Sequence, residues 1–259
     1  MFNKIPAFAG MTKNMKKIEI KTRDGICDCK VYRPENNKDH LPAMIFYGDA
    51  IGNRPAMDSM GQRFADAGYY VLMPNVYYRA GYFKPFNGMT AFTDPDERAR
   101  LTELMKSVDT EKNISDAKSF LDYLDNSEGV KKGKRGLAGY CMGGRISMAV
   151  SGTFPDRIGA FASIHGSRFF NENPDSPHLF AKNITAKVYI GGADGDAGFT
   201  PEDRAKLEQI FIDARIDYEI ELYHGAKHGF AMPDFPAYDK NASEHQFKKV
   251  IELFDSVLK

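Results

Sequence analysis

The sequence has no surplus of either charge and contains few cysteines. Lys and Arg together number 35, as do Asp and Glu, so the formal net charge is zero. A chain without a basic surplus has little with which to neutralise phosphates, which argues against a nucleic-acid-binding protein. Its 3 cysteines, Cys27, Cys29 and Cys141, are too few and too scattered for a disulfide scaffold or a tetrahedral zinc site. We therefore expect reduced thiols and a reducing compartment.

Long apolar runs are also missing. No segment approaches the roughly 20 apolar residues that a membrane span requires. Residues 1–14 have neither a continuous apolar stretch nor an obvious cleavage site, so we expect no secretory signal and a cytoplasmic location. Periodic patterning begins only at Lys16, and we expect residues 1–14 to be a disordered extension or a start-site artefact. Residues 15–259, with ordinary hydrophobic content, suit one large domain.

Strand-like and helix-like segments alternate along this domain. Strands are expected at 17–22, 26–33, 43–47, 69–73, 134–138, 158–164, 186–190 and 217–223. Helices are expected at 58–67, 96–108, 111–124, 144–152, 201–214 and 239–258. Such alternation predicts an α/β fold in which a mostly parallel sheet is covered by helices on both faces. Residues 76–95 are rich in aromatics, Gly and Pro, and we expect them to cross one end of the sheet, where binding loops lie.

Cys141 stands in a segment that is typical of a catalytic nucleophile. The expected strand that ends near Ala138 leads into Gly-Tyr-Cys-Met-Gly-Gly, with Gly139 two residues before Cys141 and Gly143 two residues after it. This spacing matches the nucleophile elbow, a strained turn that needs small residues because strand and helix backbones come close together. A cysteine at a helix N-terminus also favours the thiolate. The alternative is a buried structural cysteine before a Gly-rich turn, but the strand and helix context favours the nucleophile.

Candidates for an acid and a base follow Cys141 in the order that is usual after such an elbow. Asp194 and Asp196 lie in the loop after one expected strand, and His224 and His228 lie in the loop after the next. A thiolate needs a histidine base, and the base needs a carboxylate that fixes its tautomer. His165 precedes both aspartates, so we expect it to be a packed or substrate-side residue. The residues alone leave the choice within each pair open.

Together these motifs resemble the dienelactone hydrolase family, in particular its branch with GYCMGG at the elbow. The similarity extends from about residue 18 to residue 254. It implies the α/β-hydrolase fold and a Cys–His–Asp triad of Cys141, His228 and Asp196. His228 is favoured because Gly-Ala-Lys precedes it and Gly-Phe follows it, as in the family. Asp196 fits the family's spacing to the following proline, whereas counting from the Gly-Gly pair selects Asp194.

The resemblance also assigns residues around the triad. It implies an oxyanion hole built from the backbone N–H groups of Met142 and Ala50. Asp49 replaces a family glutamate that interacts with the resting cysteine; its alternative role is that of a loop-capping carboxylate. Arg79 matches a family arginine near the substrate carboxylate, or else is a surface arginine. Met232 stands where the family's namesake enzymes have a second arginine, so we expect a preference for neutral or weakly polar esters.

The function implied is hydrolysis of a small-molecule carboxylic ester or lactone through a covalent acyl-enzyme. Neither a metal nor an organic cofactor is implied, and we expect a monomer or homodimer with neither a nucleic-acid nor a membrane partner. One alternative is a thioesterase or acyltransferase on the same fold, which shares the acyl-enzyme step. Another is a non-catalytic α/β-hydrolase-like binding protein, although a binding role would not require a nucleophile, a base and an acid together.

Overall fold

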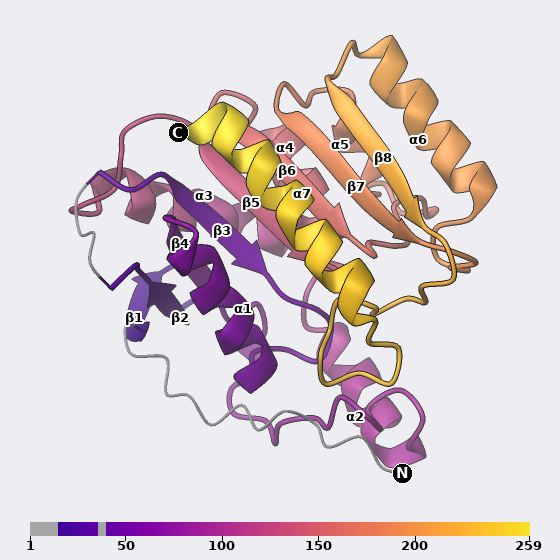
Figure 1. Cartoon of the computed structure of the whole chain (residues 1–259). Helices are drawn as coiled ribbons and strands as arrows, with labels where there is room; N and C mark the ends of the chain where they lie inside the picture. Colours follow the sequence, from indigo (N-terminus) through magenta and orange to yellow (C-terminus); the bar gives the residue numbers. More distant parts are fainter. Residues whose placement is uncertain (1–14, 36–39) are drawn as a thin grey trace.

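The computed structural model describes residues 15–35 and 40–259, so the expectation for residues 1–14 lies outside the described residues. The fold is built on one eight-stranded sheet (Figure 1). Its strands are β1 (Met15–Lys21), β2 (Ile26–Tyr32), β3 (Ala43–Tyr47), β4 (Tyr70–Pro74), β5 (Arg135–Tyr140), β6 (Ile158–Ile164), β7 (Lys187–Ala193) and β8 (Tyr218–Tyr223). Their spatial order is β1-β2-β4-β3-β5-β6-β7-β8. The pairs β1–β2 and β2–β4 are antiparallel, and the remaining pairs are parallel.

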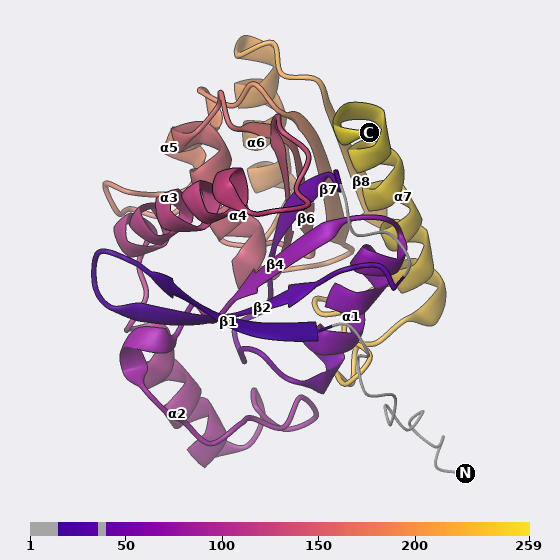
Figure 2. The same ribbon diagram turned by 90° about the vertical axis from the view of Figure 1, so that its left-hand side faces the viewer.

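Helices lie on both faces of this sheet. They are α1 (Pro55–Asp66), η1 (Tyr78–Ala80), α2 (Pro95–Met105), α3 (Thr110–Asn126), α4 (Met142–Thr153), α5 (His178–Ala181), α6 (Pro201–Asp213) and α7 (Lys240–Leu258). Figure 2 shows α1 and α7 on one side of the sheet and α3, α4 and α5 on the other. The predicted α/β architecture, a mostly parallel sheet with helices on both faces, is confirmed.

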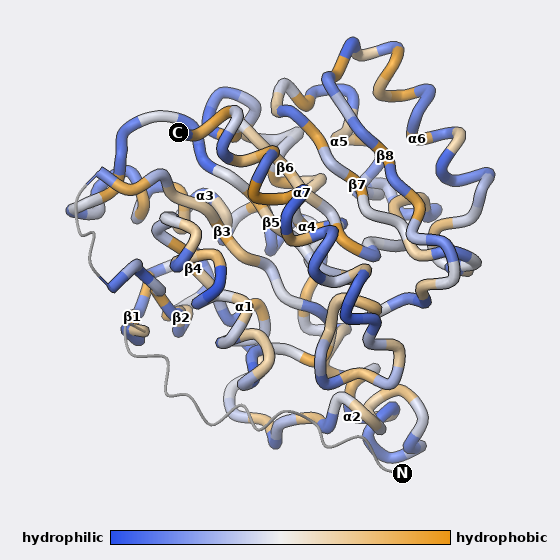
Figure 3. The backbone as a smooth tube through the Cα atoms, in the orientation of Figure 1, coloured by the Kyte–Doolittle hydropathy of each residue, from blue (hydrophilic) through white to orange (hydrophobic). Residues whose placement is uncertain are grey.

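Burial explains why the central strands are continuous apolar runs. Every residue of β3, β4, β5 and β6 is buried, because helices cover these strands above and below. The edge strands β1 and β8 keep exposed positions. Polar and apolar residues alternate along α6 and α7, as one-sided packing requires (Figure 3). None of the helices within residues 15–35 and 40–259 combines the length and apolarity needed to cross a membrane.

The helix boundaries follow local capping chemistry. The side chain of Asp94 caps α2 by accepting hydrogen bonds from the N–H groups of Asp96 and Glu97, with Pro95 in the first turn. Helix α1 begins at Pro55, three residues before the start that periodicity predicts, because proline also suits its opening turn. The short helices η1 and α5 were not predicted, since elements of one turn carry no periodic pattern.

Strand β5 and helix α4 meet in a turn that leaves no room for side chains. Cys141, at the turn, has a positive φ of 52°. A Cβ atom added to Gly139 would lie 2.1 Å from the carbonyl oxygen of Gly143. One added to Gly143 would lie 2.2 Å from the carbonyl oxygen of Tyr47 on the neighbouring strand. Because the opposing atoms belong to the backbone, they cannot move without displacing the strand or the helix.

We therefore expect Gly139→Ala to lower the free energy of unfolding by about 3 kcal/mol or more, the upper end of ordinary overpacking. The matched control is Gly48→Ala, whose new Cβ would first meet the side chain of Met57 at 3.1 Å, a flexible group that can shift. Urea denaturation of both variants measures the difference. Equal losses in the two proteins would contradict the steric explanation.

Candidate active site

Three side chains from distant segments meet at the carboxyl end of the sheet. Cys141 follows β5, Asp196 follows β7 and His228 follows β8. The Nε2 atom of His228 lies 3.1 Å from Cys141 Sγ, and its Nδ1 atom lies 2.6 Å from Asp196 Oδ2. The carboxyl ends of parallel strands are where open α/β sheets bind their ligands. The arrangement joins a thiol, an imidazole and a carboxylate in one hydrogen-bonded chain.

The two candidate pairs of acid and base differ in their surroundings. Asp196 is buried to 7% side-chain exposure, and its Oδ1 accepts a hydrogen bond of 2.8 Å from the N–H of Gly198. Asp194 and His224 form a looser pair, 3.8 Å apart, with side-chain exposures of 49% and 85%. Neither residue of this second pair lines the cavity that contains Cys141. Of the two pairs, the structure brings Asp196 and His228 to the thiol.

The charged forms of His228 and Asp196 stabilise one another. Burial lowers the pKa of His228, but its hydrogen bonds to Asp196 and Cys141 outweigh burial and raise the pKa to about 10. Burial raises the pKa of Asp196. The hydrogen bond from His228 and the charge of His228 together outweigh burial, so the pKa of Asp196 lies below its usual range. An imidazolium and a carboxylate are therefore the stable forms of this pair at neutral pH.

His165 packs behind His228. Its ring is fully buried, with its centroid 5.2 Å from that of His228 and 5.4 Å from that of Phe230. Burial, followed by the charge of His228, lowers the pKa of His165 well below its usual value. A neutral ring in this position supports one side of the His228 imidazole without competing for its proton.

Two backbone N–H groups near Cys141 are available to an oxyanion. Met142 is the first residue of α4, and Ala50 lies in the loop after β3; both line the same cavity as Cys141. Within the part of the chain that the structure describes, neither N–H has a hydrogen-bond acceptor. Tyr77, which the sequence analysis did not single out, donates a hydrogen bond of 2.8 Å to the Ala50 carbonyl and lies 3.4 Å from Met142 Sδ. Tyr77 thus contacts both residues that offer a candidate N–H group.

Asp49 has partners other than the cysteine. Its carboxylate is fully buried and accepts two hydrogen bonds of 2.8 Å from the guanidinium of Arg54 and one of 3.1 Å from the N–H of Ile51. No hydrogen bond joins Asp49 to Cys141 among the described residues. The bond to Ile51 closes the loop, as in the alternative role of a loop-capping carboxylate. Arg54 also binds Asp234 at 2.5 Å and so joins this loop to the one that follows His228.

Arg79 lies away from the thiol as well. Its guanidinium pairs with Asp24 at 2.7 Å and with Asp116 at 2.8 Å, and it does not line the cavity. Arg79 thus forms ion pairs outside the cavity, and its role near a substrate carboxylate stays a prediction. Met232 is fully buried and does not line the cavity either.

The cavity beside Cys141 has a volume of about 560 Å³. Its apolar lining comes from Phe92 and from two residues of α2, Leu101 and Met105. Its charged lining consists, apart from His228, of Arg98, Arg145 and Arg168. Within residues 15–35 and 40–259, no group of three His, Cys, Asp or Glu side chains could hold a metal ion. The sequence analysis gave the three arginines no role: Arg145 closes the elbow segment, whereas Arg98 and Arg168 belong to no motif.

Comparisons with known proteins identify the family of the chain. The model of the dienelactone hydrolase family matches residues 27–258. A Synechocystis protein provisionally named as a carboxymethylenebutenolidase is 24% identical over 221 residues, which cover 84% of this chain and 87% of that protein. Hydrolase tropI of Talaromyces stipitatus is 24% identical over 264 residues, which cover 96% and 91% of the two chains.

Solved structures show the same fold. A protein of Klebsiella pneumoniae, provisionally named a dienelactone hydrolase, superposes with a TM-score of 0.81 at 19% identity. The superposition covers 93% of this chain and 98% of that protein. The dienelactone hydrolase of Anabaena variabilis superposes with a TM-score of 0.68 at 14% identity, and the superposition covers 95% of this chain and 99% of that protein. The fold is thus that of the α/β-hydrolases. By the match of its sequence over residues 27–258, the chain belongs to the dienelactone hydrolase family.

Proposed function

We propose that this protein hydrolyses carboxylic esters or lactones through a Cys141–His228–Asp196 triad. The observation that carries the proposal is the continuous chain of contacts, 3.1 Å from thiol to imidazole and 2.6 Å from imidazole to carboxylate. Membership of the dienelactone hydrolase family supports the reaction class. So do the names of relatives, among them a provisional carboxymethylenebutenolidase.

The first half of the reaction would acylate Cys141. The thiolate attacks the ester carbonyl carbon, a C–S bond forms, and the carbonyl π electrons move to the oxygen. The N–H groups of Met142 and Ala50 stabilise this oxyanion. As the tetrahedral intermediate collapses, the C–O bond to the leaving group breaks and the His228 imidazolium gives its proton to the alkoxide. An alcohol and a thioester of Cys141 result; a lactone opens but stays attached.

The second half would release the acid. Water attacks the thioester carbonyl while His228, now neutral, accepts one proton from it. The new intermediate collapses with cleavage of the C–S bond, which regenerates the thiolate and frees a carboxylic acid. Asp196 holds Nδ1 of His228 throughout, so that Nε2 stays directed at the reacting atoms.

The proposal predicts that the protein turns over p-nitrophenyl acetate and that Cys141→Ala lowers kcat/KM by about 10³-fold or more, because the nucleophile is lost. Acid quenching during turnover followed by peptide mapping should find the acetyl group on Cys141. Adding methanol or a thiol as acceptor separates hydrolysis from acyl transfer: a hydrolase still yields mainly acetic acid. Unchanged activity in Cys141→Ala would assign the reaction to another residue, and no turnover at all would favour a binding protein.

The paired acids and bases provide matched variants. Loss of a general base costs roughly 10²–10⁴-fold in rate, so we expect His228→Ala to lose that much kcat while His224→Ala keeps most of it. Asp196→Asn should be strongly impaired because the His228 tautomer is no longer fixed, whereas Asp194→Asn should stay near the parent rate. Steady-state kinetics on one ester measures all four variants. The reverse pattern for the aspartates would move the acid's role to Asp194.

The pKa of His228 gives a test that does not depend on activity. A histidine raised from 6.5 to about 10 on folding contributes stability that is complete below pH 6.5 and is lost as pH rises through 10. NMR of the ring nitrogens should therefore show the imidazolium persisting well above pH 7. In Asp196→Asn the same signal should titrate at lower pH, because its carboxylate partner is gone. Titration of His228 near 6.5 in the parent protein would refute the charged pair.

A further inference from the structure

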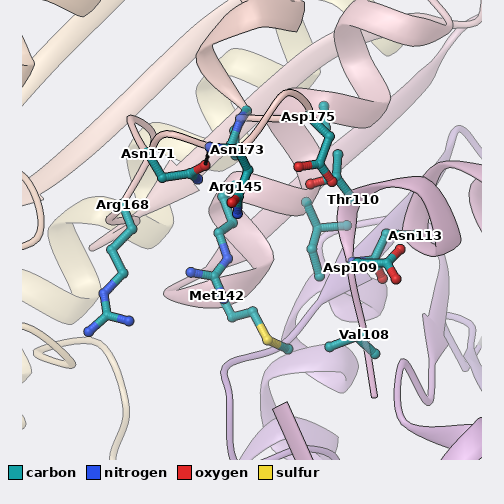
Figure 4. A pocket seen from close by; sticks show the side chains of 13 residues that line it. Val108, Asp109, Thr110, Asn113, Met142, Arg145, Arg168, Asn171, Asn173 and Asp175 are labelled. Atoms are coloured by element: carbon teal, nitrogen blue, oxygen red, sulfur yellow. Dashed lines mark hydrogen bonds between the residues drawn. The ribbon is translucent and has the colours of Figure 1, made fainter. Parts of the chain in front are cut away.

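Two arginines beside the nucleophile have no anionic partner in the protein. Arg145 lies on α4, four residues after Cys141, and Arg168 lies in the loop after β6; both line the catalytic cavity. Among the described residues, neither guanidinium makes an ion pair or a side-chain hydrogen bond. Figure 4 shows both side chains extending in the same direction, away from Asp109 and Asp175. Arg54 and Arg79, by contrast, each bind two carboxylates.

This arrangement has an electrostatic cost. Arg145 is only partly exposed, and placing an unpaired cation out of water is unfavourable. Burial lowers the pKa of Arg145, the negative charge of Cys141 opposes that effect, and the neighbouring charge of Arg168 lowers the pKa further. A third cation, Arg98 of α2, lines the same cavity, whereas no carboxylate of the described residues does. An anion between the guanidinium groups would reduce both the desolvation cost and the repulsion.

The backbone holds Arg168 in place despite strain. Its φ of 56° is positive, which is unfavourable for a residue with a side chain. The N–H of Arg168 donates a hydrogen bond of 2.6 Å to the carbonyl of Gly198, the residue whose own N–H binds Asp196. The loop of the triad acid therefore also fixes the position of Arg168.

The space around these arginines continues into a polar cavity. This second cavity, of about 330 Å³, shares Met142, Arg145 and Arg168 with the catalytic one. Its remaining wall includes amide and hydroxyl groups from Thr110, Asn113, Asn171 and Asn173, and also the carboxylates of Asp109 and Asp175. On the catalytic side, by contrast, Phe92 and α2 provide an apolar wall. The space beside Cys141 thus has one apolar part and one polar part, in which Arg145 and Arg168 extend away from the two carboxylates (Figure 4).

We propose that Arg145 and Arg168 form an anion subsite, and that the substrates are esters or lactones with unlike ends. An anionic oxyacid group such as a carboxylate binds the two guanidinium groups, and hydrogen-bonding substituents beyond it enter the polar cavity. The apolar end of the substrate lies under α2. This inference rests on the proposed function and replaces the expectation, drawn from Met232, that neutral esters are preferred. The cations come from the nucleophile's own helix and from the loop after β6.

Two matched pairs of esters test the subsite. The p-nitrophenyl monoester of glutaric acid and its methyl ester differ by an anion on the acyl side; 4-carboxyphenyl butyrate and its methyl ester differ by an anion on the alcohol side. We expect kcat/KM to favour the free acid by at least about tenfold in one pair. Arg145→Gln and Arg168→Gln should each reduce that ratio about 10- to 100-fold, the effect of losing a charged hydrogen bond. The loss should fall mainly on KM.

The control is Arg100→Gln, because Arg100 lies on α2 outside the catalytic cavity and donates to the carbonyl of Lys84. It should keep both the activity and the ratio of the parent. The subsite is refuted if neither pair shows a preference for the acid, or if the preference persists in both cavity variants. The proposed function is judged separately, by whether turnover of the neutral methyl esters requires Cys141. Hydrolysis of neutral esters with no preference for the acid would therefore refute the subsite alone.

Discussion

The close approach of the β5 and α4 backbones decides where Cys141 and both candidate oxyanion donors lie. With no side chain at positions 139 and 143, the first turn of α4 sits directly against β3, and the N–H of Gly143 donates a hydrogen bond of 3.1 Å to the carbonyl of Gly48. This contact fixes Cys141 in its strained conformation and sets Met142 beside Ala50. Cys141, the proposed nucleophile, and both candidate oxyanion donors are thus positioned by one steric requirement, which is satisfied before any substrate binds.

A second constraint acts across the cavity. Arg54 holds Asp49, in the loop that carries Ala50, and Asp234, in the loop that follows His228. Buried ion pairs contribute little net stability, because desolvation offsets the attraction. Their geometric effect is larger: a bidentate guanidinium fixes both the distance and the orientation of the groups that it joins. Arg54 thereby ties the oxyanion side of the site to the side of the base.

The parts of the fold and site that could be predicted depend on residues that lie close together in the sequence. Strand and helix order follows from periodicity, and the elbow follows from glycines on either side of Cys141. The chain order of nucleophile, acid and histidine narrowed the choice to two aspartates and two histidines. Only the family's spacing to the following proline separates Asp196 from Asp194, because a loop has no period and each aspartate has a glycine two residues away. The unpaired state of Arg145 was also out of reach, since it depends on how its side chain lies relative to carboxylates from distant segments, such as Asp109 and Asp175.

The charges at the cavity bear on more than recognition. In the proposed reaction a thiolate at Cys141 and the imidazolium of His228 balance one another, so the arginines leave the cavity with a positive potential that draws anions in. The same potential favours the oxyanion that forms during both halves of the proposed reaction. It also acts on the product, because hydrolysis creates a new carboxylate next to Arg145. Since Arg98 and Arg168 are exposed, water and salt screen their attraction for that carboxylate far more than a buried pair would allow. A partly open cationic cavity can therefore bind an anionic ester and still release a product that carries one more negative charge.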